Sequence, residues 1–136
     1  MSTQGKKAVE KVRDTAATQV NISRVLVEMM KEHKSNWTEA DIEGKLPSLY
    51  AHEKASRPTK AYVKLFSPYS NWTWYLSEYD PKERVCFALV KGFELEYGYV
   101  SVDELLSLQA NIERDTHFEP MILADIRIKI LNGGHV

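Results

Sequence analysis

Acidic side chains are the residues of this sequence whose types and spacing could perform chemistry. They fall into three groups in the second half of the chain: Glu78 with Asp80, Glu94 with Glu96, and Glu113, Arg114 and Asp115 with His117. Carboxylates beside a histidine can act as a general acid–base pair. The same acids could instead be solvated or structural, or could form a recognition surface that takes the place of nucleic-acid phosphates.

Aromatic residues are concentrated in one run, SNWTWYLSEYDP at residues 70–81. Successive side chains of a strand point to opposite faces. A strand here would place Trp72 and Trp74 with Glu78 on one face, and Tyr75 with Tyr79 on the other. We expect the two indoles to enter the core, because they bury the most apolar area. Tyr75 and Tyr79 are then candidates for contact with a partner.

Cofactor and metal motifs are missing from the sequence. The six glycines form no phosphate-binding loop, and the four histidines are scattered without an H-E-x-x-H or C-x-x-C spacing. The single cysteine, Cys86, lies in the apolar run VCFAL, which indicates a buried and inert thiol. We therefore expect no cofactor, no metal and no catalytic nucleophile.

The composition limits the kinds of partner that this protein could bind. The chain has 136 residues, a net charge of −1 and 43 % hydrophobic residues, as expected for a globular protein with a single main domain. No strongly basic stripe is present, so we expect no direct binding to nucleic acid. No apolar run is long enough for a membrane helix, the start lacks a signal peptide, and one cysteine fits a reducing compartment. These features predict a cytoplasmic protein that binds another protein.

An amphipathic helix is predicted before residue 35. Its apolar positions repeat at i, i+3, i+4, i+7 and i+8: Ile22, Val25, Leu26, Met29 and Met30. This stripe either packs in the core or forms a homodimer. A second helix begins at Thr38, with Asp41 as its capping-box partner. We divide the chain into an N-terminal helical extension, residues 1–41, and a folded domain, residues 42–136.

Alternation with a period of two begins at Ala61 and predicts four strands, at residues 61–66, 72–79, 84–91 and 94–100. Short connections, including the turn Asp80-Pro81-Lys82-Glu83, make neighbouring strands antiparallel. Ser101 then caps a helix with Glu104. Residues 125–130 read as a strand, although a helix is the alternative. The predicted fold is α+β: an antiparallel meander of about four strands, with helices packed on one face.

Several segments together resemble one family. They are KLPSLY (45–50), AYVKLF (61–66), SNWTWY (70–75), GFELEYGYVS (92–101), IERD (112–115) and HFEP (117–120). The family is a small domain of unknown function found in bacteria, phages and plasmids, and the resemblance covers about residues 45–120. Some of its members look like anti-CRISPR proteins. The resemblance implies a protein of a mobile element that acts against host defence.

The sequence thus favours a non-enzymatic binding protein of a mobile element, and anti-CRISPR inhibition is one form that this role takes. We expect its partner surface to include these residues: Tyr75, Glu78, Tyr79, Asp80, Glu94, Glu96, Glu113, Arg114 and Asp115. One alternative is a small hydrolase or transferase that uses the Glu94, Glu96, Glu113, Asp115 and His117 cluster. The other is a homodimeric scaffold joined through the N-terminal helix.

Overall fold

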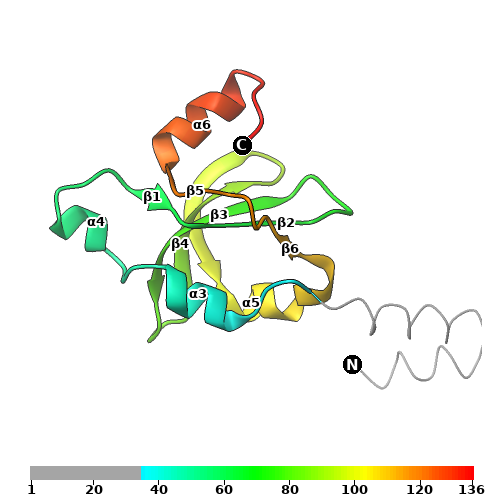
Figure 1. The fold of residues 1–136 in the computed structure, drawn as a ribbon, viewed down its shortest axis with the longest axis horizontal. Helices are drawn as coiled ribbons and strands as arrows, with labels where there is room; N and C mark the ends of the chain where they lie inside the picture. Colours follow the sequence, from blue (N-terminus) through cyan, green and yellow to red (C-terminus); the bar gives the residue numbers. More distant parts are fainter. Residues whose placement is uncertain (1–34) are drawn as a thin grey trace, which may run out of the picture. The chain divides into compact units, whose positions relative to one another are not determined.

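The structure is a computed structural model that describes residues 35–136. These residues form one compact unit, drawn in colour in Figure 1. The predicted amphipathic helix and its dimer stripe (Ile22, Val25, Leu26, Met29 and Met30) lie outside the described residues. The homodimer therefore stays a prediction.

An antiparallel five-stranded sheet in the order β5-β4-β3-β2-β6 is the centre of the domain. Its strands are β2 (Val63–Phe66), β3 (Thr73–Asp80), β4 (Val85–Lys91), β5 (Leu95–Ser101) and β6 (Glu113–Arg114). A small second sheet pairs β1 (Lys60–Ala61) with β7 (Met121–Ile122). The helices are α3 (Glu39–Lys45), α4 (Ala51–Lys54), α5 (Val102–Ser107), the 3-10 turn η1 (Gln109–Asn111) and α6 (Leu123–Leu131). The predicted α+β meander is confirmed in β2–β5.

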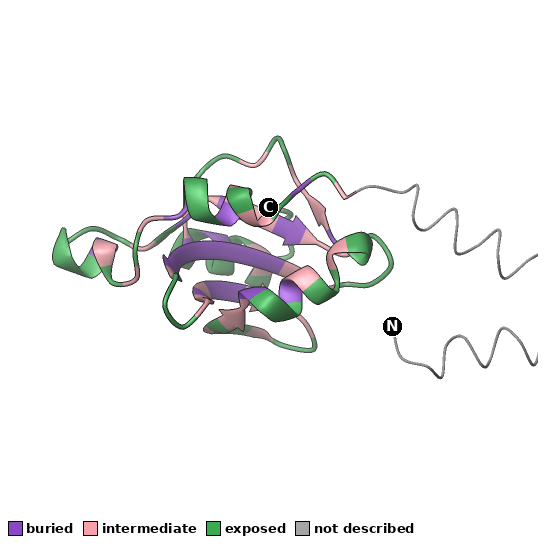
Figure 2. Ribbon diagram, turned by 90° about the horizontal axis from the view of Figure 1, so that it is seen from below, coloured by how far each residue is buried: buried purple, intermediate pink, exposed green. Residues whose placement is uncertain are grey.

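Helices cover both faces of the sheet, whereas the sequence predicted helices on one face. On the first face, Trp37 and Ile42 of the α3 region and Leu105 of α5 pack against β2, β3 and β4. On the second face, Leu123 and Ile126 of α6 pack over the sheet, so that α3 and α5 lie on the side opposite α6 (Figure 1). Buried residues accordingly gather in the sheet and on the inner sides of the helices (Figure 2).

Strand β3 contains a bulge that overturns the predicted division of its side chains. The register with β4 shifts between Leu76 and Glu78, so Ser77 is the additional residue. Beyond it, Tyr79 joins Trp74 and Leu76 in the first core, whereas Tyr75 lies in the second. Tyr75 and Tyr79 therefore point to opposite faces, not to the same face as strict alternation predicted.

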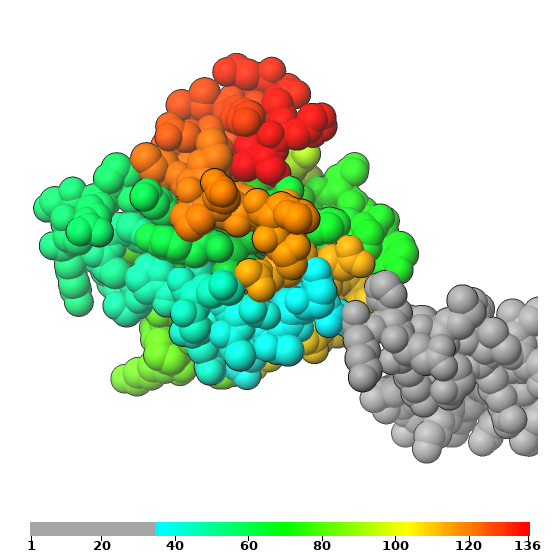
Figure 3. Space-filling view, viewed as in Figure 1, coloured from blue at the N-terminus to red at the C-terminus, as the bar shows by residue number. Residues whose placement is uncertain are grey.

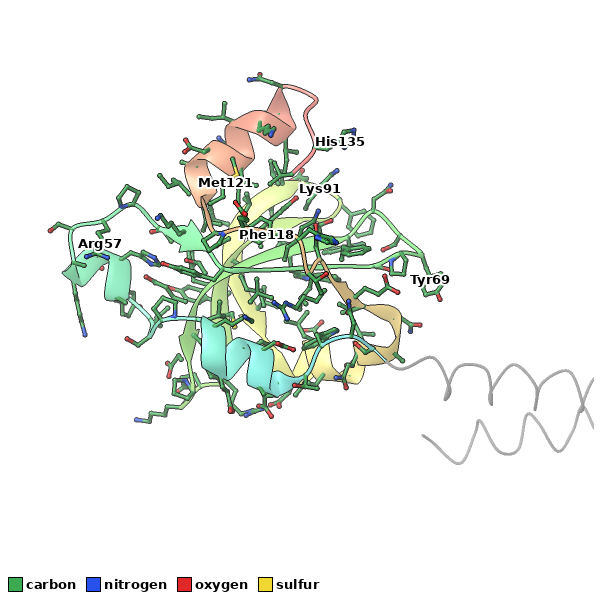
Figure 4. All side chains as sticks on the ribbon, viewed as in Figure 1. Arg57, Tyr69, Lys91, Phe118, Met121 and His135 are labelled. Atoms are coloured by element: carbon green, nitrogen blue, oxygen red, sulfur yellow. The ribbon has the colours of Figure 1, made fainter. Side chains whose placement is uncertain are left out.

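The last helix, α6, corrects a second prediction. Residues 125–130 alternate between charged and isoleucine side chains, which favoured a strand, but Leu123–Leu131 is helical. Leu123 and Ile126 are buried at helical spacing and Ile128 is exposed. Phe118 and Met121 lie between this helix and the sheet (Figure 4), and the C-terminal residues, orange and red, cover this part of the molecule (Figure 3). The need to cover the second face of the sheet thus favours a helix over a strand for these residues.

Local capping and turn signals were predicted correctly. Thr38 and Asp41 form the capping box of α3, in which the Thr38 N–H donates to the Asp41 carboxylate at 2.8 Å. The Ser101 hydroxyl accepts the Glu104 N–H at the start of α5. In the β3–β4 turn, the Asp80 carboxylate accepts the Lys82 N–H at 2.9 Å. Such signals act within a few residues, so the sequence alone reveals them.

Candidate functional site

Strand β5 is an edge of the main sheet. It pairs along its whole length with β4, and no other strand of residues 35–136 pairs with it. An edge strand presents unpaired N–H and C=O groups to its surroundings. Side chains alternate along it, so that Tyr97 and Tyr99 point to one face, and Glu96 and Gly98 to the other.

Four aromatic rings gather on one side of this edge: Tyr50, Phe87, Tyr97 and Tyr99. We call them the tyrosine patch. The Phe87 ring stacks on Tyr97, with centroids 6.2 Å apart, and meets Tyr99 edge-on at 5.6 Å. Tyr99 is hydrogen-bonded to Tyr50, which raises the pKa of Tyr99. The three tyrosines are 45 to 57 % exposed, and exposed tyrosine is typical of protein-binding surfaces.

A buried carboxylate holds Tyr50 in this patch. Tyr50 has φ = 68°, in the left-handed region that a tyrosine rarely adopts. Its N–H donates to Glu78 Oε1 at 3.0 Å, and the His52 N–H donates to Oε2 at 2.9 Å. The His52 ring also contacts Oε2 through Nδ1 at 2.5 Å, and its Nε2 lies 2.8 Å from the Tyr62 hydroxyl. Glu78 thus fixes the start of α4.

The ionisation of Glu78 follows from these contacts. Burial acts to raise the pKa of this carboxyl, but hydrogen bonds from the backbone and ring of His52 and the backbone of Tyr50 outweigh burial, so the pKa is lowered. The carboxylate is therefore charged at neutral pH. The same segment is tied to β3 by main-chain bonds between Leu49 N–H and Tyr79 O and between Tyr79 N–H and Pro47 O.

A cavity of about 530 Å³ lies on the other side of β5, between the sheet and the α5–η1 segment. Trp72 and Trp74 line it with their rings stacked at 6.0 Å between centroids. Its only charged lining residues, within the described part of the chain, are Glu96 of β5 and Glu104 of α5. A side chain at Gly98, which also lines the cavity, would project into open space. We call this space the indole cavity.

The structure brings together only some of the acidic residues that the sequence predicted to form a site. The neighbouring Glu94 carboxyl raises the pKa of Glu96, by hydrogen bonding to its protonated form and by its charge. Glu113, Arg114, Asp115 and His117 lie at β6 and the loop after it, on the opposite edge of the sheet. Glu96 lines the indole cavity, whereas Asp115 and His117 line a different one. The structure thus separates the cluster on which the catalytic alternative depended.

Residues near β6 form structural contacts. Arg114 pairs with Asp41 at 3.0 Å, which joins β6 to α3. Asp115 pairs with Lys64 at 3.3 Å. Burial acts to raise the pKa of Asp115, but the His117 N–H and the Lys64 ammonium outweigh it and lower that pKa. Glu113 occupies a β6 position opposite Phe66.

Three residues expected at the partner surface are buried. Tyr75, Glu78 and Tyr79 are each 5 % exposed or less, and Asp80 lies at the β3–β4 turn. Burial raises the pKa of Tyr75 to about 12, with Asp115 adding to the effect. Sequence reasoning missed Tyr50, Tyr97, Tyr99 and Gly98. The signal was present in Tyr97-Gly98-Tyr99, where the alternation places both rings on one face.

Metal ligands, the cysteine and the helix lengths can each be checked within residues 35–136. No group of three or more histidine, cysteine, aspartate or glutamate side chains there could hold a metal ion. Cys86 is buried as predicted, which raises the pKa of its thiol to about 12. Between residues 35 and 136, each helix is too short or too polar to cross a bilayer.

Fold and site together define a small α+β domain with an exposed aromatic edge and an acidic cavity. The chain belongs to the DUF2958 family, described as a protein of unknown function, whose model matches residues 23–128. This match extends beyond the predicted resemblance at both ends. Searches of curated proteins and of solved structures found no match.

Proposed function

We propose that this protein is a non-enzymatic binding protein of a mobile genetic element, and that it inhibits a host defence effector by occupying a surface of that effector. The tyrosine patch at the edge of β5 carries the proposal. Tyrosine contributes large contact area with few rotatable bonds, and aromatic residues dominate the binding energy of many interfaces. Three exposed tyrosines on adjoining elements offer a contact surface of this kind.

An anti-CRISPR inhibitor is the specific form of this proposal. RNA-guided nucleases hold their guide–target duplex in a positively charged channel. Two carboxylates lie at the start of β5: Glu94 just before the strand, and Glu96 on the face opposite the tyrosine patch. Carboxylates could pair with the channel's lysines and arginines while the tyrosines supply apolar contact. The resemblance to a family with anti-CRISPR-like members supports the same role.

The test uses the full chain against a panel of purified RNA-guided nucleases. Size-exclusion chromatography measures complex formation, and target cleavage measures inhibition. Replacing Tyr97 and Tyr99 together by alanine should weaken binding by at least ~10-fold, because each is a candidate hot-spot residue. Inhibition should weaken in parallel.

Tyr69→Ala is the matched control. Tyr69, labelled in Figure 4, is 73 % exposed at the β2–β3 turn and is not one of the four residues of the tyrosine patch. Its replacement removes the same side chain and should leave binding unchanged. An effector that is inhibited equally by the double variant would disprove the role of the patch. Absence of both complex and inhibition across the panel would reject the anti-CRISPR role for those effectors.

A further inference from the structure

The indole cavity has the size and lining of a binding site. Its volume of about 530 Å³ lies within the ~300–1,000 Å³ of typical ligand pockets. The stacked rings of Trp72 and Trp74 offer aromatic surface, and the lining includes Val90 and Leu105 as apolar walls. An aromatic and apolar wall combined with two acids, and with no basic residue in the described lining, complements an organic cation.

The lack of a side chain at position 98 leaves part of the cavity open. Gly98 pairs with Ala88, which pairs with Leu76, so it lies in a row that faces the first core. A Cβ atom at Gly98 would have no other atom within 4 Å. Glycine in a strand interior weakens the strand and often marks a place where another chain or a ligand approaches.

The cavity also reaches the main chain of β5. Six consecutive residues, 96–101, line it. Side chains of a strand alternate between faces, so consecutive lining residues indicate contact with the backbone itself. The outer edge of β5 has no strand partner among residues 35–136. An extended segment could therefore add to the sheet here and direct one side chain into the cavity.

We propose that the indole cavity receives an arginine side chain from an extended segment of the partner protein, which pairs with β5 as an additional strand. This inference rests on the proposed function, since it needs a protein partner. Guanidinium is planar and weakly hydrated, stacks on indole faces and binds carboxylates through two parallel hydrogen bonds. Trp72 and Trp74 supply the stacking surface, and Glu96 and Glu104 supply the carboxylates.

Repulsion between acids supports a cationic occupant. Glu94 lies close enough to Glu96 for its carboxyl, by hydrogen bonding and by charge, to raise the pKa of Glu96. Two carboxylates in contact are unfavourable without a cation or a proton. An arginine in the cavity would relieve this repulsion, and a neutral side chain of the same shape would not.

The binding test uses the full chain and a blocked pentapeptide of sequence Thr-Val-Arg-Val-Thr, acetylated and amidated. The matched probe carries citrulline, the neutral isostere of arginine, in place of the arginine. Tryptophan fluorescence and calorimetry measure affinity. We expect the arginine peptide to bind at least ~10-fold more tightly than the citrulline peptide, as loss of a cation–π contact and a carboxylate pair implies.

Two variants separate the cavity from general charge effects. Gly98→Val fills the open space with a residue that favours strands. It should abolish peptide binding without lowering the free energy of unfolding. Glu96→Gln combined with Glu104→Gln keeps the shape and should remove the preference for arginine over citrulline. Glu83 is an exposed acid in the β3–β4 turn, and Glu83→Gln is the control. It should change neither the affinity for the arginine peptide nor the preference for arginine over citrulline.

The outcomes distinguish this inference from the proposed function. Equal binding of the two peptides, or full binding to Gly98→Val, would overturn the arginine site. An effector complex that depends on Tyr97 and Tyr99 but tolerates Gly98→Val would also overturn it, while the proposed function would stand. Arginine-selective peptide binding that Gly98→Val abolishes would establish the site even if no effector on the panel were inhibited.

Discussion

At the scale of single residues, Glu78 is the side chain on which the geometry near the tyrosine patch depends most. Its carboxylate accepts the N–H groups of Tyr50 and His52 and contacts the His52 ring. The next residue, Tyr79, makes the backbone hydrogen bonds that dock residues 47–49 on β3. One buried charge therefore positions the segment that supplies Tyr50.

Replacing Glu78 by glutamine should destabilise the domain by about 2–3 kcal/mol, since hydrogen bonds to a buried charged group have about this value. Glutamine keeps the shape but places an NH₂ group where one N–H now donates. Urea unfolding at pH 7 measures the change. Glu83→Gln, in an exposed turn, should alter stability by less than about 0.5 kcal/mol. Equal unfolding midpoints for the two variants would contradict the role given to Glu78.

The contribution of Glu78 should depend on pH in a defined direction. Its pKa is lower in the folded protein than the ordinary value of 4.5, despite burial, because of the hydrogen bonds from His52 and Tyr50. A lowered carboxyl pKa stabilises the fold above the ordinary value, and that stability is lost as the pH falls through the folded pKa. The difference in unfolding free energy between the wild type and Glu78→Gln should therefore be largest near pH 7 and shrink below pH 4.5. Denaturant titrations at pH 7, 5, 4 and 3 measure it, and a difference that stays constant would refute the linkage.

At the scale of elements, local sequence signals predicted the meander, whereas contacts between distant segments determine the bulge in β3 and the helical state of α6. The turn at Asp80 and the cap at Ser101 are formed by neighbouring residues. The bulge at Ser77 depends on distant segments, since the Ser77 hydroxyl donates to Lys60 O, and Tyr79 beyond it bonds to Pro47. Period-two reasoning therefore identified β3 as a strand but assigned Tyr79 to the wrong face.

The same distinction explains α6. Its alternation of isoleucine with charge is equally compatible with a strand, and no local signal resolves the choice. The second face of the sheet decides it, because Leu123 and Ile126 share a helical stripe that fits against Tyr75 and Leu89. The tyrosine patch escaped prediction for a related reason: which strand forms the sheet edge is a property of the topology.

A pair of substitutions tests the helical assignment of α6. Ile126 is fully buried, whereas Ile128 is 56 % exposed. Ile126→Ala should cost about 2–4 kcal/mol, as for other large-to-small core changes, and Ile128→Ala less than about 0.5 kcal/mol. In a strand the two residues would share a face, so equal costs in urea unfolding would contradict the helix.

At the scale of the whole molecule, each face of the sheet is closed by a segment near one end of the described chain. Residues 35–37 close the first face: the Trp37 indole N–H donates to Ile112 O at 3.0 Å, and Asn36 exchanges two hydrogen bonds with the Arg114 backbone. On the second face, which α6 covers, the carbonyl oxygen of Val136 accepts hydrogen bonds from Lys64 and Tyr75. Stability is thus distributed over segments distant in sequence.

Because residues 35–37 pack on the first face, the residue at which the folded domain begins can be tested with fragments. A fragment of residues 35–136 keeps every described residue of both cores and should unfold cooperatively. The fragment 42–136, which begins at the boundary predicted from the sequence, lacks Trp37, a fully buried side chain. It also lacks Asp41, the partner of Arg114.

Loss of a buried tryptophan alone costs about 3–5 kcal/mol, a large part of the ~5–15 kcal/mol that stabilises a typical domain. The shorter fragment should therefore unfold at markedly lower urea concentration or fail to fold, as circular dichroism would record. Equal stability of the two fragments would show that residues 35–41 are dispensable and that the domain begins at 42.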